Sequence, residues 1–158
     1  MNGGMDELYR EVILDHHRRP RGHDPLPGPA DARAEGKNPS CGDELVLELA
    51  CPGGTIAGTH VACRGCAIAT ASGSILAELL TGRPPQQARE LAEAFREAMH
   101  SADGVLADEL DPGDLEVLTG VRKFPARVKC ALLPWITLLA ALDAQSDGTA
   151  TAPATTEV

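Results

Sequence analysis

The chain has 158 residues and a formal net charge of −9, with 43% apolar but only 3% aromatic residues. This length allows one domain with a sizeable hydrophobic core, which here must be built from Leu, Val, Ile and Ala. The acidic balance argues against a nucleic-acid-binding protein, because an acidic surface repels a phosphate backbone. No stretch approaches 18 apolar residues and no signal-peptide pattern is seen, so we expect no membrane partner and a cytoplasmic location.

The N-terminal part of the chain is predicted to be a helix followed by an extended connector. Apolar residues recur at helical spacing over Met5–Arg18, and Pro20 ends this pattern. Prolines and glycines are frequent in residues 20–40, which indicates a connector with one short strand near Asp31–Lys37. We expect residues 1–4 to be disordered.

The next segment has the alternation of a β-hairpin. Leu45, Leu47 and Leu49 lie on one face of a predicted strand, and a second strand is predicted over Ile56–Cys63. The sequence Pro-Gly-Gly at 52–54 lies between them and is typical of a turn.

The rest of the chain is dominated by helical periodicity. Helices are predicted over Ile68–Leu79, after Pro84-Pro85, at Asp114–Leu118 and over Cys130–Leu142. Residues 144–158 are of low complexity, and we expect them to be disordered. The predicted fold is therefore α+β: a single domain over residues 5–143, with a small antiparallel β-sheet of about three strands and helices on one face.

Three cysteines and one aspartate form a candidate metal site. Cys41 and Asp43 flank a glycine, Cys66 follows a glycine at the start of a predicted helix, and Cys130 starts the last helix. Three thiolates and a carboxylate are a suitable ligand set for tetrahedral zinc or for iron. Helix starts favour thiolates, because their backbone N–H groups stabilise negative charge.

Basic residues also lie beside the last of these cysteines. Arg127 and Lys129 are close enough to Cys130 in sequence to offset the negative charge of such a site.

The other cysteines and the histidines are consistent with simpler roles. Free cysteines are often buried as small apolar residues, and we prefer this interpretation for Cys51 and Cys63. Cys63 and Cys66 form a Cys-x-x-Cys pair, but no second pair completes a zinc ribbon and no βαβ pattern supports a redox dithiol. The neighbouring His16 and His17 do not share a helical face, so we interpret them as surface or packing residues. The odd number of cysteines argues against a disulfide framework.

Four motifs resemble one family of iron–sulfur assembly proteins, the family of IscU and of the N-terminal part of NifU. The motifs are Asp15-His-His-Arg-Arg-Pro-Arg21, Asn38-Pro-Ser-Cys-Gly-Asp43, Gly65-Cys-Ala-Ile-Ala-Thr-Ala-Ser72 and Gly120-Val-Arg-Lys-Phe-Pro-Ala-Arg-Val-Lys-Cys130. They occur in order over about residues 7–142, and together they make the resemblance specific. It implies an IscU/NifU-N-like fold.

Two details make the chain more similar to the SufU branch. An insertion that includes residues 111–120 lengthens the stretch between Cys66 and Cys130, and Lys129 stands where IscU-type proteins carry a histidine. Because a protonated lysine cannot bind a metal, this resemblance implies Asp43 as the fourth ligand.

The resemblance implies a zinc-dependent sulfurtransferase that serves a SufS-type cysteine desulfurase. Cys41 would accept persulfide sulfur and pass it towards a downstream iron–sulfur assembly scaffold, while Asp43, Cys66 and Cys130 stay on zinc. Cys41 would have to leave the metal to react, so we predict that the desulfurase supplies a replacement ligand. Two alternatives stay open: a scaffold that binds iron or a labile [2Fe–2S] cluster, and a zinc module that only binds a partner.

Overall fold

The fold is built on one four-stranded sheet. The computed structural model describes residues 3–147 and 152–156, and its strands are β1 (Ala32–Asn38), β2 (Asp43–Ala50), β3 (Gly58–Arg64) and β4 (Ala152–Thr155). Their spatial order is β3-β2-β1-β4, with antiparallel pairing of β1 with β2 and of β2 with β3. β4 pairs with β1 in parallel. The predicted hairpin is confirmed, and the strand predicted near Asp31–Lys37 is β1.

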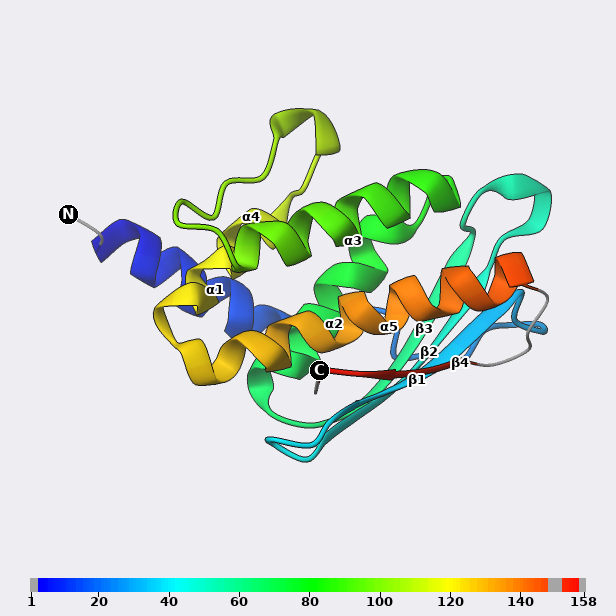
Figure 1. Ribbon diagram of the computed structural model, residues 1–158, viewed down its shortest axis with the longest axis horizontal. Coiled ribbons are helices and arrows are strands. Elements are labelled where there is room, and N and C mark those ends of the chain that lie inside the picture. Colours follow the sequence, from blue (N-terminus) through cyan, green and yellow to red (C-terminus); the bar gives the residue numbers. More distant parts are fainter. Residues whose placement is uncertain (1–2, 148–151, 157–158) are drawn as a thin grey trace.

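The fourth strand corrects two expectations about the sheet and the C-terminal segment. We expected about three strands and disorder from residue 144 onward, yet β4 lies at the outer edge of β1 (Figure 1). This strand satisfies backbone groups of β1 that an edge would leave unpaired, and an edge strand tolerates Pro153. Composition could not show this, because the pairing partner lies more than 100 residues away. The expected disorder at residues 1–2, 148–151 and 157–158 concerns positions outside the described residues.

Among the described residues, five α-helices accompany the sheet: α1 (Gly3–Arg18), α2 (Ala67–Leu80), α3 (Pro85–Met99), α4 (Asp114–Leu118) and α5 (Val128–Asp147). The predicted helices all exist, but α1 begins at Gly3 inside the segment expected to be disordered, and α5 is longer than predicted at both ends. Figure 1 shows α2, α3 and α5 on one face of the sheet. The α+β class with helices covering one face is confirmed.

The core lies between the sheet and these helices. Leu45, Leu47 and Leu49 of β2 are buried, as their alternation predicts, and the Trp135 ring of α5 packs against Phe95 of α3 at 5.7 Å between ring centroids. By length and composition α5 is apolar enough to cross a membrane. Most of it is buried in the fold, however, as expected for the core helix of a globular domain.

Short 3-10 turns connect the main elements. They are η1 (Pro52–Gly54), η2 (Asp108–Leu110), η3 (Thr119–Lys123) and η4 (Pro125–Arg127). The last two lead from α4 directly into α5, so they deliver Cys130 to the first turn of that helix.

Candidate metal centre

The fold brings three of the four predicted ligands into one cluster. The ligand atoms of Cys41, Asp43 and Cys130 all lie within 4.8 Å of one another. Asp43 and Cys130 are buried, whereas Cys41 is exposed. The cluster therefore contains two buried residues and one exposed residue, Cys41.

The turn between β1 and β2 positions Cys41 and Asp43. The backbone N–H groups of Cys41 and Gly42 both donate to the Asn38 carbonyl, at 3.2 and 2.9 Å. Gly42 has a φ of +75°, a left-handed conformation that side chains other than glycine disfavour. The chain reverses there, and Asp43 begins β2 with its carboxylate directed inward.

Cys66 is connected to the cluster by a hydrogen bond to Asp43. Its backbone N–H donates to Asp43 Oδ1 at 3.0 Å, and its own sulfur accepts from the Ala69 N–H at 3.5 Å as the N-cap of α2. The sulfur does not lie within 4.8 Å of all three other ligand atoms. Cys66 thus lies at a helix start, as predicted, and its sulfur both caps the helix and interacts with the Cys130 side chain.

Gly65 allows this close approach. A Cβ atom at position 65 would lie 2.5 Å from Asp43 Oδ1 and 2.9 Å from Asp43 Cγ. Real Cβ atoms essentially never come so near, so only glycine leaves room for the carboxylate here.

Cys130 is a buried thiol whose surroundings favour a bound cation. It is fully buried in the first turn of α5, and its thiol donates to Cys41 Sγ at 3.5 Å. Burial raises the pKa of Cys130, and the neighbouring Asp43, Cys41 and Cys66 raise it further. Without a cation these groups favour the neutral thiol, and a bound metal ion would be needed to keep them in charged form.

The separations fit zinc. Zn–S bonds of about 2.3 Å in a tetrahedral site place two sulfurs roughly 3.8 Å apart. The observed Cys41–Cys130 separation of 3.5 Å is close to this value. The donor set of soft sulfurs and one carboxylate suits zinc or iron, so the residues present fit the metal that the sequence predicts.

Sequence reasoning missed Asn38 as a functional residue. It is fully buried at the end of β1, and its Nδ2 group donates to Asp43 Oδ2 at 3.2 Å and to Cys130 Sγ at 3.5 Å. Its position at the start of the Asn-Pro-Ser-Cys motif was the available signal, but asparagine in such a motif is also a common turn residue.

Arg127 supplies positive charge beside the cluster. Its pKa is raised, first by a hydrogen bond to the Cys130 sulfur and then by the charges of Cys66, Cys130 and Cys41. That Arg127 offsets the charge of the site stays a prediction. Lys129 is half-buried next to Cys130, and its part in charge compensation stays a prediction.

The other two cysteines are partly buried and carry raised pKa values. Burial raises the pKa of Cys63 to about 11 and also raises that of Cys51. All five cysteines are free, so Cys63 and Cys66 do not form a disulfide. A thiol with the pKa of Cys63 is protonated at neutral pH and is therefore a poor nucleophile.

His16 is a buried packing residue, one of the two roles expected for it. Its Nδ1 lies 2.6 Å from Ser74 Oγ and its Nε2 lies 2.9 Å from Asp114 Oδ2. These bonds connect α1 to α2 and to α4, which belongs to the insertion. His17 is exposed.

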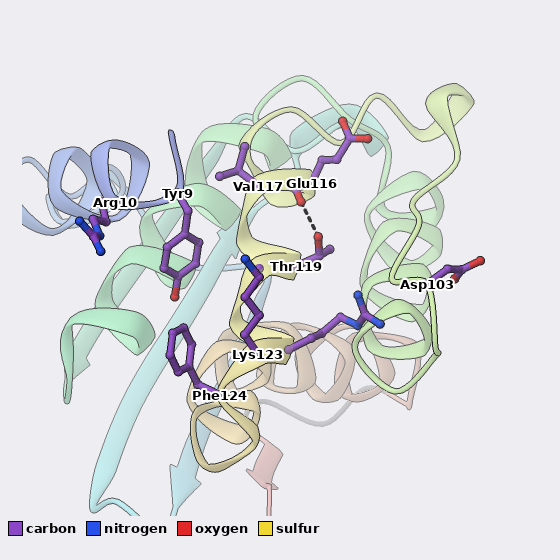
Figure 2. Close-up of a pocket in the computed structure, with 10 residues that line it drawn as sticks. Tyr9, Arg10, Asp103, Glu116, Val117, Thr119, Lys123 and Phe124 are labelled. Atoms are coloured by element: carbon purple, nitrogen blue, oxygen red, sulfur yellow. Dashed lines mark hydrogen bonds between the residues drawn. The ribbon is translucent and has the colours of Figure 1, made fainter. Parts of the chain in front are cut away.

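A groove of about 540 Å³ lies between α1 and the segment that leads into α5. Figure 2 shows the rings of Tyr9 and Phe124 pointing toward each other along one of its walls. The Tyr9 ring approaches the backbone of Gly120, where a Cβ atom would lie 2.9 Å from it. Burial raises the pKa of Tyr9, and the charge of Cys66 adds to this effect.

Comparisons with known proteins agree with this fold. The model of the NifU-like N terminal domain matches residues 8–131. The chain is 35% identical to the zinc-dependent sulfurtransferase SufU of Bacillus subtilis (strain 168), over 85% of this chain and 88% of that protein. It is also 35% identical to the iron–sulfur cluster assembly scaffold protein IscU of Streptococcus pyogenes serotype M1, over 87% of this chain and 84% of that protein.

A solved structure supports the same relationship. The crystal structure of a Fervidobacterium islandicum AW-1 protein, whose name assigns it to iron–sulfur cluster assembly in the SUF system, superposes with a TM-score of 0.75. The two chains are 33% identical, over 84% of this chain and 94% of the other. The chain therefore belongs to the NifU-like N-terminal domain family, which includes SufU and IscU, and it is an iron–sulfur cluster assembly protein of that family.

Proposed function

We propose that this protein is a zinc-dependent sulfur acceptor that takes persulfide sulfur from a cysteine desulfurase onto Cys41. The observation that carries the proposal is the difference in exposure within one cluster: Cys41 is exposed, while Asp43 and Cys130 are buried. A large partner can therefore reach one sulfur of the cluster and leave the buried ligands in place. A cytoplasmic location, where thiols stay reduced, remains a prediction.

Cys41, Asp43, Cys66 and Cys130 are the residues that would hold the metal. When bound, zinc would keep these thiols deprotonated at neutral pH and would tie a β-turn to the first turns of two helices. Cys66 would have to turn its sulfur from the Ala69 N–H towards the other three ligands. Arg127 would reduce the net negative charge that remains.

The transfer itself is a thiol–persulfide exchange. The Cys41 thiolate attacks the outer sulfur of the persulfide that the desulfurase carries on its own cysteine. A bond forms between Cys41 Sγ and that sulfur, the S–S bond of the donor persulfide breaks, and the donor cysteine leaves as a thiolate. Cys41 then holds the persulfide, and no external oxidant or reductant is needed. The onward recipient would be a downstream iron–sulfur assembly scaffold.

Mass spectrometry of the modified protein tests this proposal. After incubation with a cysteine desulfurase and cysteine, we expect the peptide that contains Cys41 to gain the mass of one sulfur atom. The peptides that contain Cys51 and Cys63 serve as internal controls, because their raised pKa values make these thiols poor acceptors. Sulfur found equally on all cysteines, or absent from Cys41, would contradict the proposal.

The second candidate function is a scaffold on which a [2Fe–2S] cluster is assembled. The similarity to IscU supports it, and the same thiolates suit iron. Anaerobic addition of iron and sulfide distinguishes the two functions. A cluster that forms with the absorption of [2Fe–2S] and passes to an apo-ferredoxin would favour the scaffold, whereas a protein that retains zinc and forms no cluster would favour the sulfur acceptor.

A further inference from the structure

The C-terminal strand reaches the metal centre through one hydroxyl group. β4 runs parallel to β1 with Lys37 opposite Thr155, and the next residue, Thr156, donates its backbone N–H to the Lys37 carbonyl at 3.1 Å. The side chain of Thr156 is buried at 7% exposure, and its Oγ1 donates to Asn38 Oδ1 at 2.9 Å.

This hydrogen bond holds the Asn38 side chain from the side opposite the cluster. The amide has an acceptor oxygen and a donor nitrogen, and the two ends exchange places when the group rotates by half a turn. The acceptor-only Asp43 carboxylate takes the nitrogen, which faces Asp43 Oδ2 and Cys130 Sγ, and Thr156 fixes the other end of the group by donating to the oxygen. A donor in this position stabilises a carboxylate and a thiolate, whereas the amide oxygen would repel both.

We propose that Thr156 is a positioning residue for the metal centre, which acts by orienting the Asn38 amide toward Asp43 and Cys130. The inference rests on the proposed function, in that the centre binds zinc. It assigns a role to a segment that lies beyond the residues matched by the family model. The C-terminal strand then has a functional role, because its pairing with β1 places Thr156 against Asn38.

Zinc affinity measured by competition with a chromogenic chelator tests this role directly. Loss of a group that supports metal ligands typically lowers affinity by roughly 10- to 100-fold. Thr156 contacts Asn38 and not a ligand, so for Thr156→Val we expect a smaller loss of zinc affinity, about 3- to 10-fold. Thr156→Ser keeps the hydroxyl group and should restore affinity close to that of the parent protein.

A matched control makes the same change of hydroxyl to methyl elsewhere. Thr81, whose Oγ1 donates to the Ala77 carbonyl, lies at the far end of α2 from Cys66, about 20 Å along the helix. Thr81→Val should leave zinc affinity unchanged. Circular dichroism and thermal melting of all variants report whether each one folds.

A double-mutant cycle tests whether Thr156 acts through Asn38. Asn38→Leu should weaken zinc binding more than Thr156→Val, and the double variant should be no weaker than Asn38→Leu alone. Additive losses, equal losses for Thr156→Val and Thr156→Ser, or an unchanged affinity in Thr156→Val would each overturn the inference. If the parent protein bound no zinc at all, the proposed function would fail instead, and the two failures are thereby distinguished.

Discussion

The sulfur atoms of Cys41 and Cys130 lie 3.5 Å apart, although 89 positions separate the two residues in the chain. One lies on an exposed β-turn and the other is buried in the first turn of α5. Their contact joins the turn between β1 and β2 to α5, and Asp43 completes the cluster from the start of β2. The centre is therefore a candidate metal site that also connects the β1–β2 turn and β2 to α5.

Removal of zinc should lower the melting temperature, because the metal ties together three segments that are distant in sequence. Zinc at 1,000 times its Kd stabilises the folded state by about 4 kcal/mol, which for a domain of this size corresponds to roughly 8 to 16 °C. Calorimetry before and after exhaustive chelation measures the change. Identical melting curves, with metal loss verified by elemental analysis, would show that the ion has no structural part.

Gly65→Ala should displace the Asp43 carboxylate and lower zinc affinity by about ten-fold or more. The reason is the 2.5 Å separation between the added Cβ and Asp43 Oδ1. Gly28→Ala is the matched control, since nothing lies within 4 Å of a Cβ at that position. Chelator competition on both variants gives the comparison. Equal affinities would mean that Asp43 is not a ligand or that it adapts without cost.

Cys63 should make the protein less stable at alkaline pH. Its pKa is raised from 9.0 to about 11 by burial, so above pH 9 the unfolded chain loses this proton while the folded chain retains it. The unfolded state then binds fewer protons, and the free energy of unfolding falls as pH rises from about 9 to 11, by roughly 1–2 kcal/mol.

Urea unfolding across this pH range measures the effect, and Cys63→Ala should reduce the alkaline loss. Cys51→Ala removes the other thiol whose pKa burial raises, and it shows how much of the alkaline loss is due to that residue. A Cys63→Ala protein that loses as much stability as the parent would show that another group is responsible.

His16→Ala should destabilise the fold by about 2–4 kcal/mol, because it removes a buried side chain that bonds to Ser74 and Asp114. The neighbouring His17 is exposed, so His17→Ala should change stability little. Chemical denaturation of the two variants provides a comparison within one motif. If both had the stability of the parent, His16 would not be the residue that holds the insertion to α1 and α2.

Regular elements were accessible from the sequence because their signals are local. The alternation of Leu45, Leu47 and Leu49 and the helical spacing of α1 to α3 depend on residues close together in the chain. The ligand candidates were found because cysteines and an aspartate beside glycines and helix starts have few other uses. Cys41, Asp43 and Cys130 do meet, while the sulfur of Cys66 lies next to them and caps α2.

Long-range polar contacts were not accessible in this way. Nothing local marks Thr156 as a partner of Asn38, or His16 as a partner of Ser74 and Asp114, since each contact joins residues that are 58 to 118 positions apart. The strand β4 was missed for the same reason, because a polar segment of low complexity forms a strand only when an open sheet edge is offered to it.

The most direct test of the central claim is the turnover of a SufS-type cysteine desulfurase on cysteine, measured with this protein zinc-loaded and iron rigorously excluded. We predict a large rise in turnover that is lost with Cys41→Ala and kept with Cys51→Ala, because only the exposed sulfur of the centre accepts the persulfide. No rise with the zinc-loaded protein, or a rise that persists in Cys41→Ala, would contradict the assignment of Cys41 as the sulfur acceptor.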